Sequence, residues 1–375
     1  MSTTRSIRFF VGFAIAWATV IAFMLFGKLW LGEPGSMLKS AALFLWLFAV
    51  IIWCAFGVVG EADHLAELLG EPLGTLVLTL SIVIIEVALI SAMMLSAHSA
   101  PTLGRDTMFA VLMIVLNGVV GLALFLGGLR HREQAYNLQG AVAYLSVIAP
   151  LSVIALILPK FKISGPSDAL TKTQSFFFSL FTLLLYAVFL AVQTVRHRNF
   201  FVEPSLGVTS GESLESNPVR AQSTGRDVGR HTLLLIFLIL PIVLLAKQLA
   251  KLLDYGITML HAPPAIGGVL IALIIFTPEG VSALRAALEN QLQRAVNLCL
   301  GSIASTIGLT VPAVVAIGLV TGQPVVLGID NASTVLLATT LILSVITFCG
   351  PRTTVLEGTV HLVIFGVYIV LIFSP

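Results

Sequence analysis

Residues 75–90 read TLVLTLSIVIIEVALI, an apolar stretch interrupted by a single carboxylate, Glu86. A run of this length and composition is typical of a helix that crosses a membrane. A carboxylate placed in hydrocarbon costs about 2.5–3.5 kcal/mol on insertion scales and more by other estimates. The stretch therefore predicts a helix whose acid faces the interior of a bundle, where such groups mark ion or proton pathways.

The whole chain has the same apolar character. Of its 375 residues, 58% are hydrophobic and 10% are charged, which is typical of an all-α polytopic membrane protein. Cutting the sequence at Gly, Pro and charge clusters predicts eleven spans: 9–31, 37–60, 73–97, 107–129, 140–158, 175–195, 232–253, 265–287, 296–320, 331–349 and 355–373. The seventh and tenth are the weakest, because Lys247 and Lys251 shorten one and the other is brief.

Composition also argues against several classes of protein. The net charge is +2 and no basic stretch is interleaved with aromatic residues, so nucleic acid is not an expected partner. The three cysteines lie inside or at the ends of apolar runs, without the spacing of a disulfide framework or a metal site. No phosphate-binding G-x-x-x-x-G-K-[ST] motif occurs, so we expect no cofactor and transport driven by ion gradients.

One long polar segment, 196–231, divides the chain. It is rich in Ser and Gly and contains Arg196, Arg198, Arg220, Arg226 and Arg230. Its composition predicts a flexible linker, and a modest excess of Lys and Arg places it and the N-terminus in the cytoplasm of a multi-pass inner-membrane protein. The expected organisation is an N-terminal helix (1–35), a first repeat (36–195), the loop (196–231) and a second repeat (232–375).

A second glutamate occupies the equivalent position in the second half. The segment GTLVLTLSIVIIEV (74–87) aligns with GGVLIALIIFTPEG (267–280), which places Glu86 on Glu279. The two acids lie on the third and eighth predicted spans, and an odd separation inserts the copies in opposite orientations. This is the inverted-repeat plan of secondary transporters, whose ion sites lie near the midplane. A lone buried glutamate could be protonated and merely join helices, but that role gives no reason for a symmetric pair.

Oxygen-bearing side chains accompany both acids. Thr79 lies two turns before Glu86 and shares its helix face. Thr277 precedes Pro278, and we expect the proline to open the helix beside Glu279 and to free a backbone carbonyl as a cation ligand.

The two companion spans, the fourth and the ninth, supply further oxygen atoms. Their polar residues are Asn117, Asn297, Ser302, Ser305 and Thr306. Carboxylate, hydroxyl, amide and backbone oxygens together favour a hard cation such as calcium, which takes six to eight oxygen ligands. No His or Cys cluster argues for zinc or copper. Protons and the cation would compete for the same oxygens, which yields antiport if the bundle reorients only when the site is occupied.

Three stretches resemble a known family: GEPLGTLVLTLSIVIIEVALISAMM (70–94), APTLGRDTMFAVLMIVLNGVVGLALFLGG (100–128) and TPEGVSALRAALENQLQRAVNLCLGSIASTIGLTVPAVV (277–315). They are similar to the bacterial ChaA-type calcium/proton antiporters, in the cation/proton exchanger branch of the cation/calcium exchanger superfamily. The likeness runs from the second span to the C-terminus. The Gly-Asn that precedes each glutamate in the wider branch is absent here.

The resemblance implies one N-terminal helix followed by two inverted five-helix repeats. It implies that Glu86 and Glu279 carry the cation and the proton, and that Asn117 and Ser302 match polar positions of the companion helices. It also suggests a proton path through Glu357 in the motif TVLEG. An acid at that place equally suits a helix start.

The first hypothesis is therefore a secondary antiporter that exchanges calcium, and perhaps sodium or potassium, for protons. A purely monovalent sodium or potassium/proton antiporter is the alternative within this class. An intramembrane enzyme such as a lipid phosphatase needs an arginine beside the acid, yet Arg285 lies six residues beyond Glu279. A channel fits two acids in opposite repeats less well than alternating access does.

Overall fold

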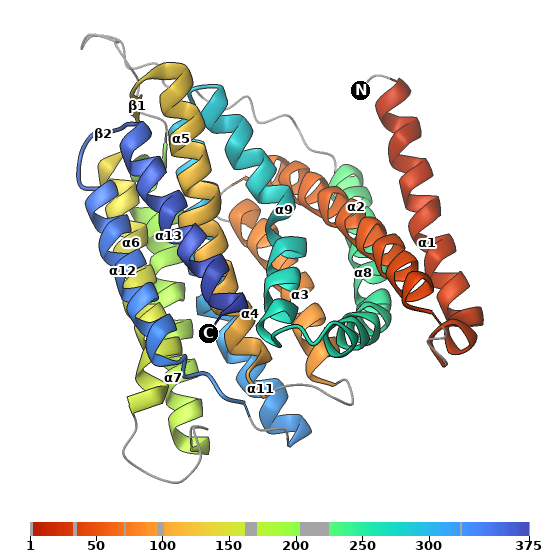
Figure 1. The fold of residues 1–375 in the computed structure, drawn as a ribbon. Helices are drawn as coiled ribbons and strands as arrows, with labels where there is room; N and C mark the ends of the chain where they lie inside the picture. Colours follow the sequence, from red (N-terminus) through yellow and green to blue (C-terminus); the bar gives the residue numbers. More distant parts are fainter. Residues whose placement is uncertain are drawn as a thin grey trace.

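The computed structural model describes residues 3–32, 36–70, 73–95, 101–161, 171–202, 225–322 and 325–374, and nearly all of them are helical (Figure 1). Ten helical segments in these ranges are long and apolar enough to cross a membrane. The shorter apolar helix Asn331–Thr347 brings the number to the eleven that the sequence predicted. The all-α polytopic fold is confirmed.

The first half of the chain contains six of these segments. In chain order its elements are α1 (Thr3–Gly32), α2 (Met37–Leu69), α3 (Leu73–Met94), α4 (Leu103–Leu112), the π-helix η1 (Met113–Val119), α5 (Val120–His131), β1 (Gln134–Ala135), α6 (Leu138–Ser152), the π-helix η2 (Val153–Ile157), the 3-10 helix η3 (Leu158–Phe161), α7 (Lys172–Ala191), the π-helix η4 (Val192–Arg196) and the 3-10 helix η5 (Arg198–Phe201).

The second half contains the other five. Its elements are α8 (Gly225–Met259), α9 (Ala265–Leu288), α10 (Leu292–Ser305), the π-helix η6 (Thr306–Thr310), α11 (Val311–Thr321), α12 (Asn331–Thr347), β2 (Arg352–Thr353) and α13 (Val355–Phe373).

The seventh span differs most from its predicted bounds. α8 has 35 residues and begins at Gly225, inside the predicted 196–231 linker, of which 203–224 lies outside the described residues. Lys247 and Lys251 do not end this helix but lie exposed on its surface. A lysine can follow an apolar surface with its methylene chain while its charge reaches water, so it does not mark a helix end.

The helices that carry the two glutamates run in opposite directions. The start of α9 lies beside the end of α3 and the start of α4: a Cβ added to Gly267 would lie 3.6 Å from Met93 and 3.4 Å from Leu103. The other end of α9 meets the end of α5, where His131 Nε2 lies 2.9 Å from the carbonyl oxygen of Leu288. The second half is thus inverted relative to the first, as the sequence predicted.

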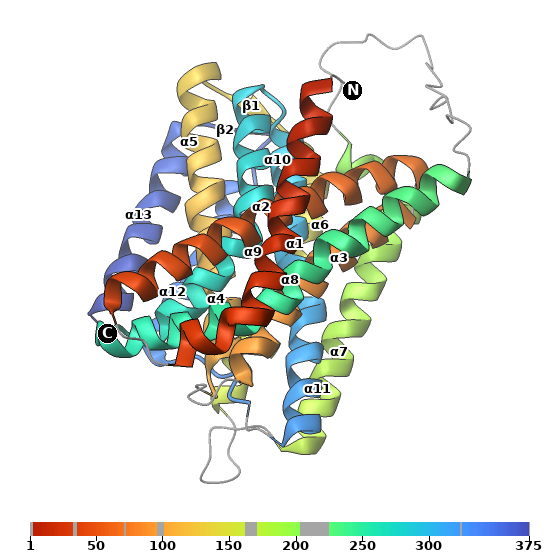
Figure 2. The ribbon, with the colours of Figure 1, turned by 90° about the vertical axis from the view of Figure 1, so that its right-hand side faces the viewer.

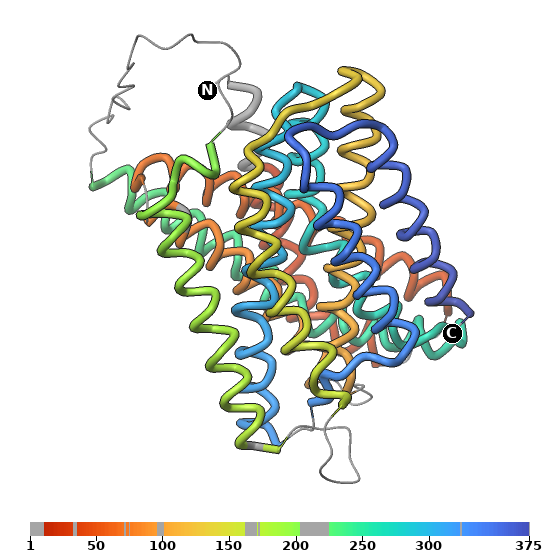
Figure 3. The backbone as a smooth tube through the Cα atoms, turned by 90° about the vertical axis from the view of Figure 1, so that its left-hand side faces the viewer, coloured from red at the N-terminus to blue at the C-terminus, as the bar shows by residue number. Residues whose placement is uncertain are grey.

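The described residues pack into two hydrophobic clusters. One is formed by α1, α2, α3 and α8 with Leu103 of α4 and Val314 of α11, and the other by the remaining buried residues of α4 to α7 and α10 to α13. α2 and α8 lie obliquely across the bundle in Figure 2, whereas α6, α7 and α12 run close to one another in Figure 3. α9 belongs to both, since Ile271 and Ile274 lie in the first cluster and Ala272 and Phe276 lie in the second.

The backbones of the two halves approach each other closely between α5 and α13. A Cβ on Gly358 of α13 would lie 2.3 Å from the backbone nitrogen of Phe125, and one on Gly128 of α5 would lie 2.7 Å from that of Val355. At the same end of the bundle the strands β1 and β2 pair antiparallel, with Gln134 opposite Thr353. Glycines that let helix backbones approach closely are typical of packing inside membranes.

We therefore expect Gly358→Leu to destabilise the fold, because any side chain at this position must push α13 away from α5. The free energy of unfolding should fall by about 1–3 kcal/mol or more. Gly366→Leu is the matched control in the same helix, since a Cβ there meets nothing within 4 Å. Thermal denaturation in detergent, followed by size-exclusion chromatography, measures the difference. Equal melting temperatures for the two variants would contradict this account of the contact.

Candidate functional site

The two symmetric glutamates lie together in the interior of the bundle. The side chain of Glu86 on α3 is 0% exposed and that of Glu279 on α9 is 5% exposed. The helices α3 and α9 contact each other, and both contact α10. The structure therefore brings together the two acids that the sequence placed in separate repeats.

A single companion helix donates hydrogen bonds to both acids. The Ser302 hydroxyl on α10 donates to Glu279 Oε2 at 2.6 Å, and the Thr306 hydroxyl at the start of η6 donates to Glu86 Oε2 at 3.0 Å. The two hydroxyls are four residues apart and so lie on the same helix face. Ser302 and Thr306 thus join the two glutamate-bearing helices at one place.

The same face continues to Thr310, a residue that the sequence analysis overlooked. Thr310 lies beside the Glu86 carboxyl, yet its Oγ1 and Glu86 Oε1 are both buried without a hydrogen-bond partner. A buried carboxylate oxygen without a partner is costly. This oxygen is therefore a position where a proton or a cation would be stabilising. The spacing of four residues from Thr306 was the signal that could have identified Thr310.

Both companion helices widen into a π-helix near the site. η1 interrupts the helix formed by α4 and α5, and η6 interrupts the helix formed by α10 and α11. Such short π-helical stretches are frequent at functional sites, because they change which side chains face the interior. Their presence in corresponding helices of the two repeats extends the symmetry of the glutamates to the helices beside them.

Three of the predicted ligands have other partners in this structure. Thr277 donates its hydroxyl to a carbonyl of its own helix, and Ser305 donates to the carbonyl of Ser302 at 2.9 Å. This is the common behaviour of Ser and Thr inside helices. Thr79 lies beside the Tyr186 side chain on α7. A role for these three residues in ion binding stays a prediction.

Asn117 in η1 is buried, and its amide is hydrogen-bonded to side chains of other helices rather than to the acids. Its Nδ2 donates to Thr340 Oγ1 at 2.9 Å and its Oδ1 lies 3.1 Å from His361 Nδ1. Asn297 donates to the carbonyl of Phe201 at 2.6 Å instead of reaching the site. The sequence analysis also missed His361, although an ionisable residue in an otherwise apolar span is a signal of function.

Pro278 lies one residue before Glu279 inside α9. α9 continues as an α-helix through Pro278, so the predicted opening beside Glu279 is wrong. Proline removes one backbone donor, but a helix packed on several sides tolerates that loss.

Glu357 accepts hydrogen bonds from the backbone nitrogen and the hydroxyl of Thr354, which form a capping box at the start of α13. Its place in a proton path stays a prediction.

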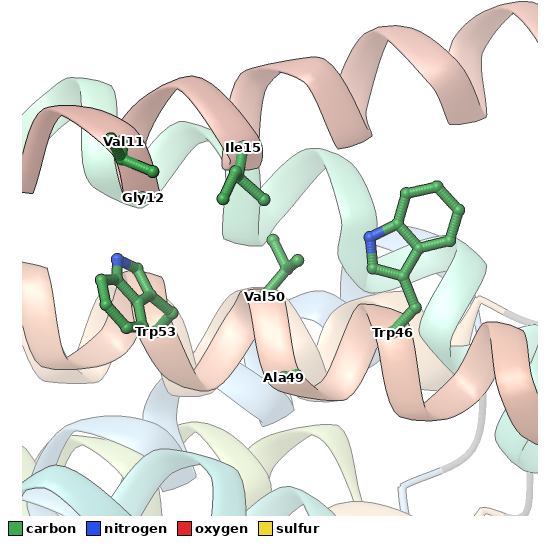
Figure 4. A pocket seen from close by; sticks show the side chains of 7 residues that line it. All are labelled: Val11, Gly12, Ile15, Trp46, Ala49, Val50 and Trp53. Atoms are coloured by element: carbon green, nitrogen blue, oxygen red, sulfur yellow. The ribbon is translucent and has the colours of Figure 1, made fainter. Parts of the chain in front are cut away.

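The hollows on the surface lie elsewhere. An apolar groove of about 350 Å³ separates α1 from α2, where Trp46, Val50 and Trp53 face Val11 and Ile15 (Figure 4). A second hollow of about 310 Å³, at the start of α4 and α9, includes Arg105, Asp106 and Asp330. Neither is lined by the glutamates, which are almost completely buried by the described residues. The described residues also contain no group of three His, Cys, Asp or Glu side chains that could hold a metal.

Comparison with known proteins identifies the family. The model of the sodium/calcium exchanger protein family matches residues 39–195 and 230–374. The chain is 39% identical over 338 residues, covering 90% of each chain, to the putative ionic transporter y4hA of Sinorhizobium fredii. It is also 39% identical over 324 residues, covering 86% of this chain and 87% of the other, to the sodium-potassium/proton antiporter ChaA of Escherichia coli.

A solved structure shows the same fold. The Ca2+/H+ antiporter protein YfkE superposes with a TM-score of 0.71 at 17% identity, covering 97% of this chain and 99% of the other. The family and these relatives consist of transporters, so the alternative of an intramembrane enzyme fails. The chain therefore belongs to the sodium/calcium exchanger protein family and is a cation antiporter of the membrane.

Proposed function

We propose that the chain exchanges calcium for protons at a site formed by Glu86 and Glu279. The observation that carries this proposal is the pair of buried carboxyls, one from each inverted repeat, which accept hydrogen bonds from one helix. Two protonated carboxyls are neutral, and so are two carboxylates with one calcium ion. Exchange of one calcium ion for two protons thus avoids a buried net charge, which would be costly.

The packing supports alternating access as the mechanism. The two hydrophobic clusters meet along α9, which has one face in each, and the glutamates lie near this boundary. Movement of α1, α2 and α8 relative to the helices of the other cluster would expose the acids first to one side of the membrane and then to the other. The buried site seen here is an intermediate that such a movement must pass through.

A monovalent cation is the second candidate substrate, and a specific observation favours it. The Escherichia coli relative is named a sodium-potassium/proton antiporter. One sodium or potassium ion together with one proton would also leave the two carboxyls neutral. The proposal of calcium rests on the paired acids and on YfkE, which shares the fold and is named a Ca2+/H+ antiporter.

We also propose a location in the inner membrane, with the N-terminus and the 196–231 loop in the cytoplasm. The end of the bundle where α5 stops and α13 begins carries Arg130, Arg132, Arg196, Arg198 and Arg352. Positively charged residues are enriched on the cytoplasmic side of membrane proteins.

Substitution of either glutamate should abolish exchange. In proteoliposomes that contain a pH-sensitive dye, calcium should release protons through the wild type. Glu86→Gln and Glu279→Gln should lower the rate by about 100-fold or more, because a neutral amide can neither take up a proton nor carry the negative charge that holds a cation. The same assay with sodium and with potassium identifies the substrate. Calcium-driven exchange at the wild-type rate in either variant would contradict the proposed site.

Two threonine hydroxyls, one bonded to Glu86 and one bonded to a carbonyl of its own helix, offer a matched comparison. Thr306→Val removes the donor to Glu86 and should slow exchange roughly 10- to 100-fold, the effect of losing one hydrogen bond to a charged group. Thr359→Val on α13 is the control, since that hydroxyl donates to the Val355 carbonyl of its own helix and lies outside the predicted site. Equal rates for the two variants would remove Thr306 from the site.

Lower pH should weaken apparent cation affinity, because protons occupy the oxygens that the cation needs. If two protons compete with one calcium ion, the half-saturating concentration should rise by up to about 100-fold per pH unit in the acid range, against about tenfold for one proton. Initial rates at a series of pH values give this slope. A half-saturating concentration that does not change with pH would rule out a shared site.

A further inference from the structure

We propose that His361 is a positioning residue for transport, which holds the side chain of Asn117 in one orientation as a ligand for the cation. The inference rests on the proposed function, because Asn117 belongs to the predicted cation site. None of the contacts that carry it involves either glutamate.

His361 is an ionisable residue in the interior of α13. Its side chain is 0% exposed and both ring nitrogens have partners. Nδ1 lies 3.1 Å from Asn117 Oδ1, and Nε2 lies 2.9 Å from the hydroxyl oxygen of Thr347 on α12. The imidazole therefore joins the last two helices of the second repeat to a companion helix of the first.

The contacts of Asn117 fix the direction of this chain of hydrogen bonds. Its Nδ2 donates to Thr340 Oγ1 and also lies 3.6 Å from Met113 Sδ, a sulfur that can only accept. The amide nitrogen must face Met113, so the amide oxygen faces His361. Because that oxygen can only accept, the hydrogen of this bond belongs to His361 Nδ1.

Close packing fixes the position from which the His361 side chain starts. A Cβ added to Gly121, one turn beyond Asn117, would lie 2.9 Å from His361 Cβ. A related contact occurs in the other half, where a Cβ on Gly308 of η6 would lie 2.6 Å from Tyr186 Cβ on α7. In each case the last helix of one repeat places the Cβ of a ring-bearing residue against a glycine in the companion helix of the other repeat.

This arrangement prepares Asn117 to bind a cation. A carbonyl oxygen has two acceptor positions, and the His361 donor occupies one of them, so the other remains for an ion. An amide held in place loses less entropy on binding than a free one. Loss of the His361 donor should therefore lower cation affinity, with a smaller effect on the maximal rate.

Two amide substitutions separate the roles of the ring nitrogens. The amide nitrogen of His361→Asn can take the place of Nδ1 and keep the bond to Asn117. The amide oxygen of His361→Gln can take the place of Nε2 and keep only the bond from the Thr347 hydroxyl. Relative to the wild type, we expect the half-saturating calcium concentration to change little in His361→Asn and to rise roughly 3- to 10-fold in His361→Gln. In an Asn117→Ala background, His361→Gln should have no further effect.

A second pair of variants tests the other end of the amide. Thr340→Val removes the acceptor for Asn117 Nδ2 and should also raise the half-saturating concentration. Thr339→Val is its neighbour and control, because that hydroxyl bonds the carbonyl of Val335. This pair decides the question if the His361 variants fail to fold.

Calcium-induced thermal stabilisation in detergent gives a readout of binding that does not depend on transport. Wild-type exchange and stabilisation, together with equal calcium affinities for His361→Asn and His361→Gln or for Thr340→Val and Thr339→Val, would overturn this inference and leave the proposed function standing. If the wild type neither exchanges nor is stabilised by calcium, sodium or potassium, the proposed function fails and this inference fails with it.

Discussion

An ionised carboxylate that is cut off from water is stable only with a hydrogen-bond donor or a cation beside it. Glu86 and Glu279 are both in this position, and the surrounding helices are arranged to meet the requirement. Ser302 and Thr306 supply one donor each, while Glu86 Oε1 is left without one. The site is thus only partly satisfied by the protein itself, which is what a transporter needs, since a fully satisfied acid would have no reason to bind and release an ion.

The helices around the acids are shaped by contacts between the two repeats. α13 of the second repeat packs against α5 of the first, and α7 of the first packs against η6 and α11 of the second. Glycines on the companion helices make this close approach possible. Both halves of the chain therefore contribute to the proposed site, with Glu86 from the first and Glu279, Ser302 and Thr306 from the second.

The sequence predicted the centre of the site better than its surroundings. An acid in an apolar span is rare, so the pair Glu86 and Glu279 could be identified without coordinates, and their separation by five positions in the order of spans, an odd number, gave the inversion. Ser302 and Thr306 were among several hydroxyls on one helix, and only the packing shows which of these reach an acid. Asn117 looked equivalent from its position, but Thr340 and His361 lie far away in the sequence and determine which way its amide points. Pro278 suggested a break that the surrounding helices prevent.

The contact between α5 and α13 also matters for how the chain is made. The strand β1 finds its partner β2 only near the end of synthesis, and the ion pair between Glu133 and Arg352 joins residues 219 positions apart. Until α13 enters the membrane, the glycine face of α5 has no neighbour and Asn117 lacks the imidazole that orients it. The first repeat is therefore inserted in the bilayer without these contacts while the second repeat is translated. A ribosome that stalls before residue 355 would leave α5 without α13 and the strand β1 paired with a partner that has no helix after it.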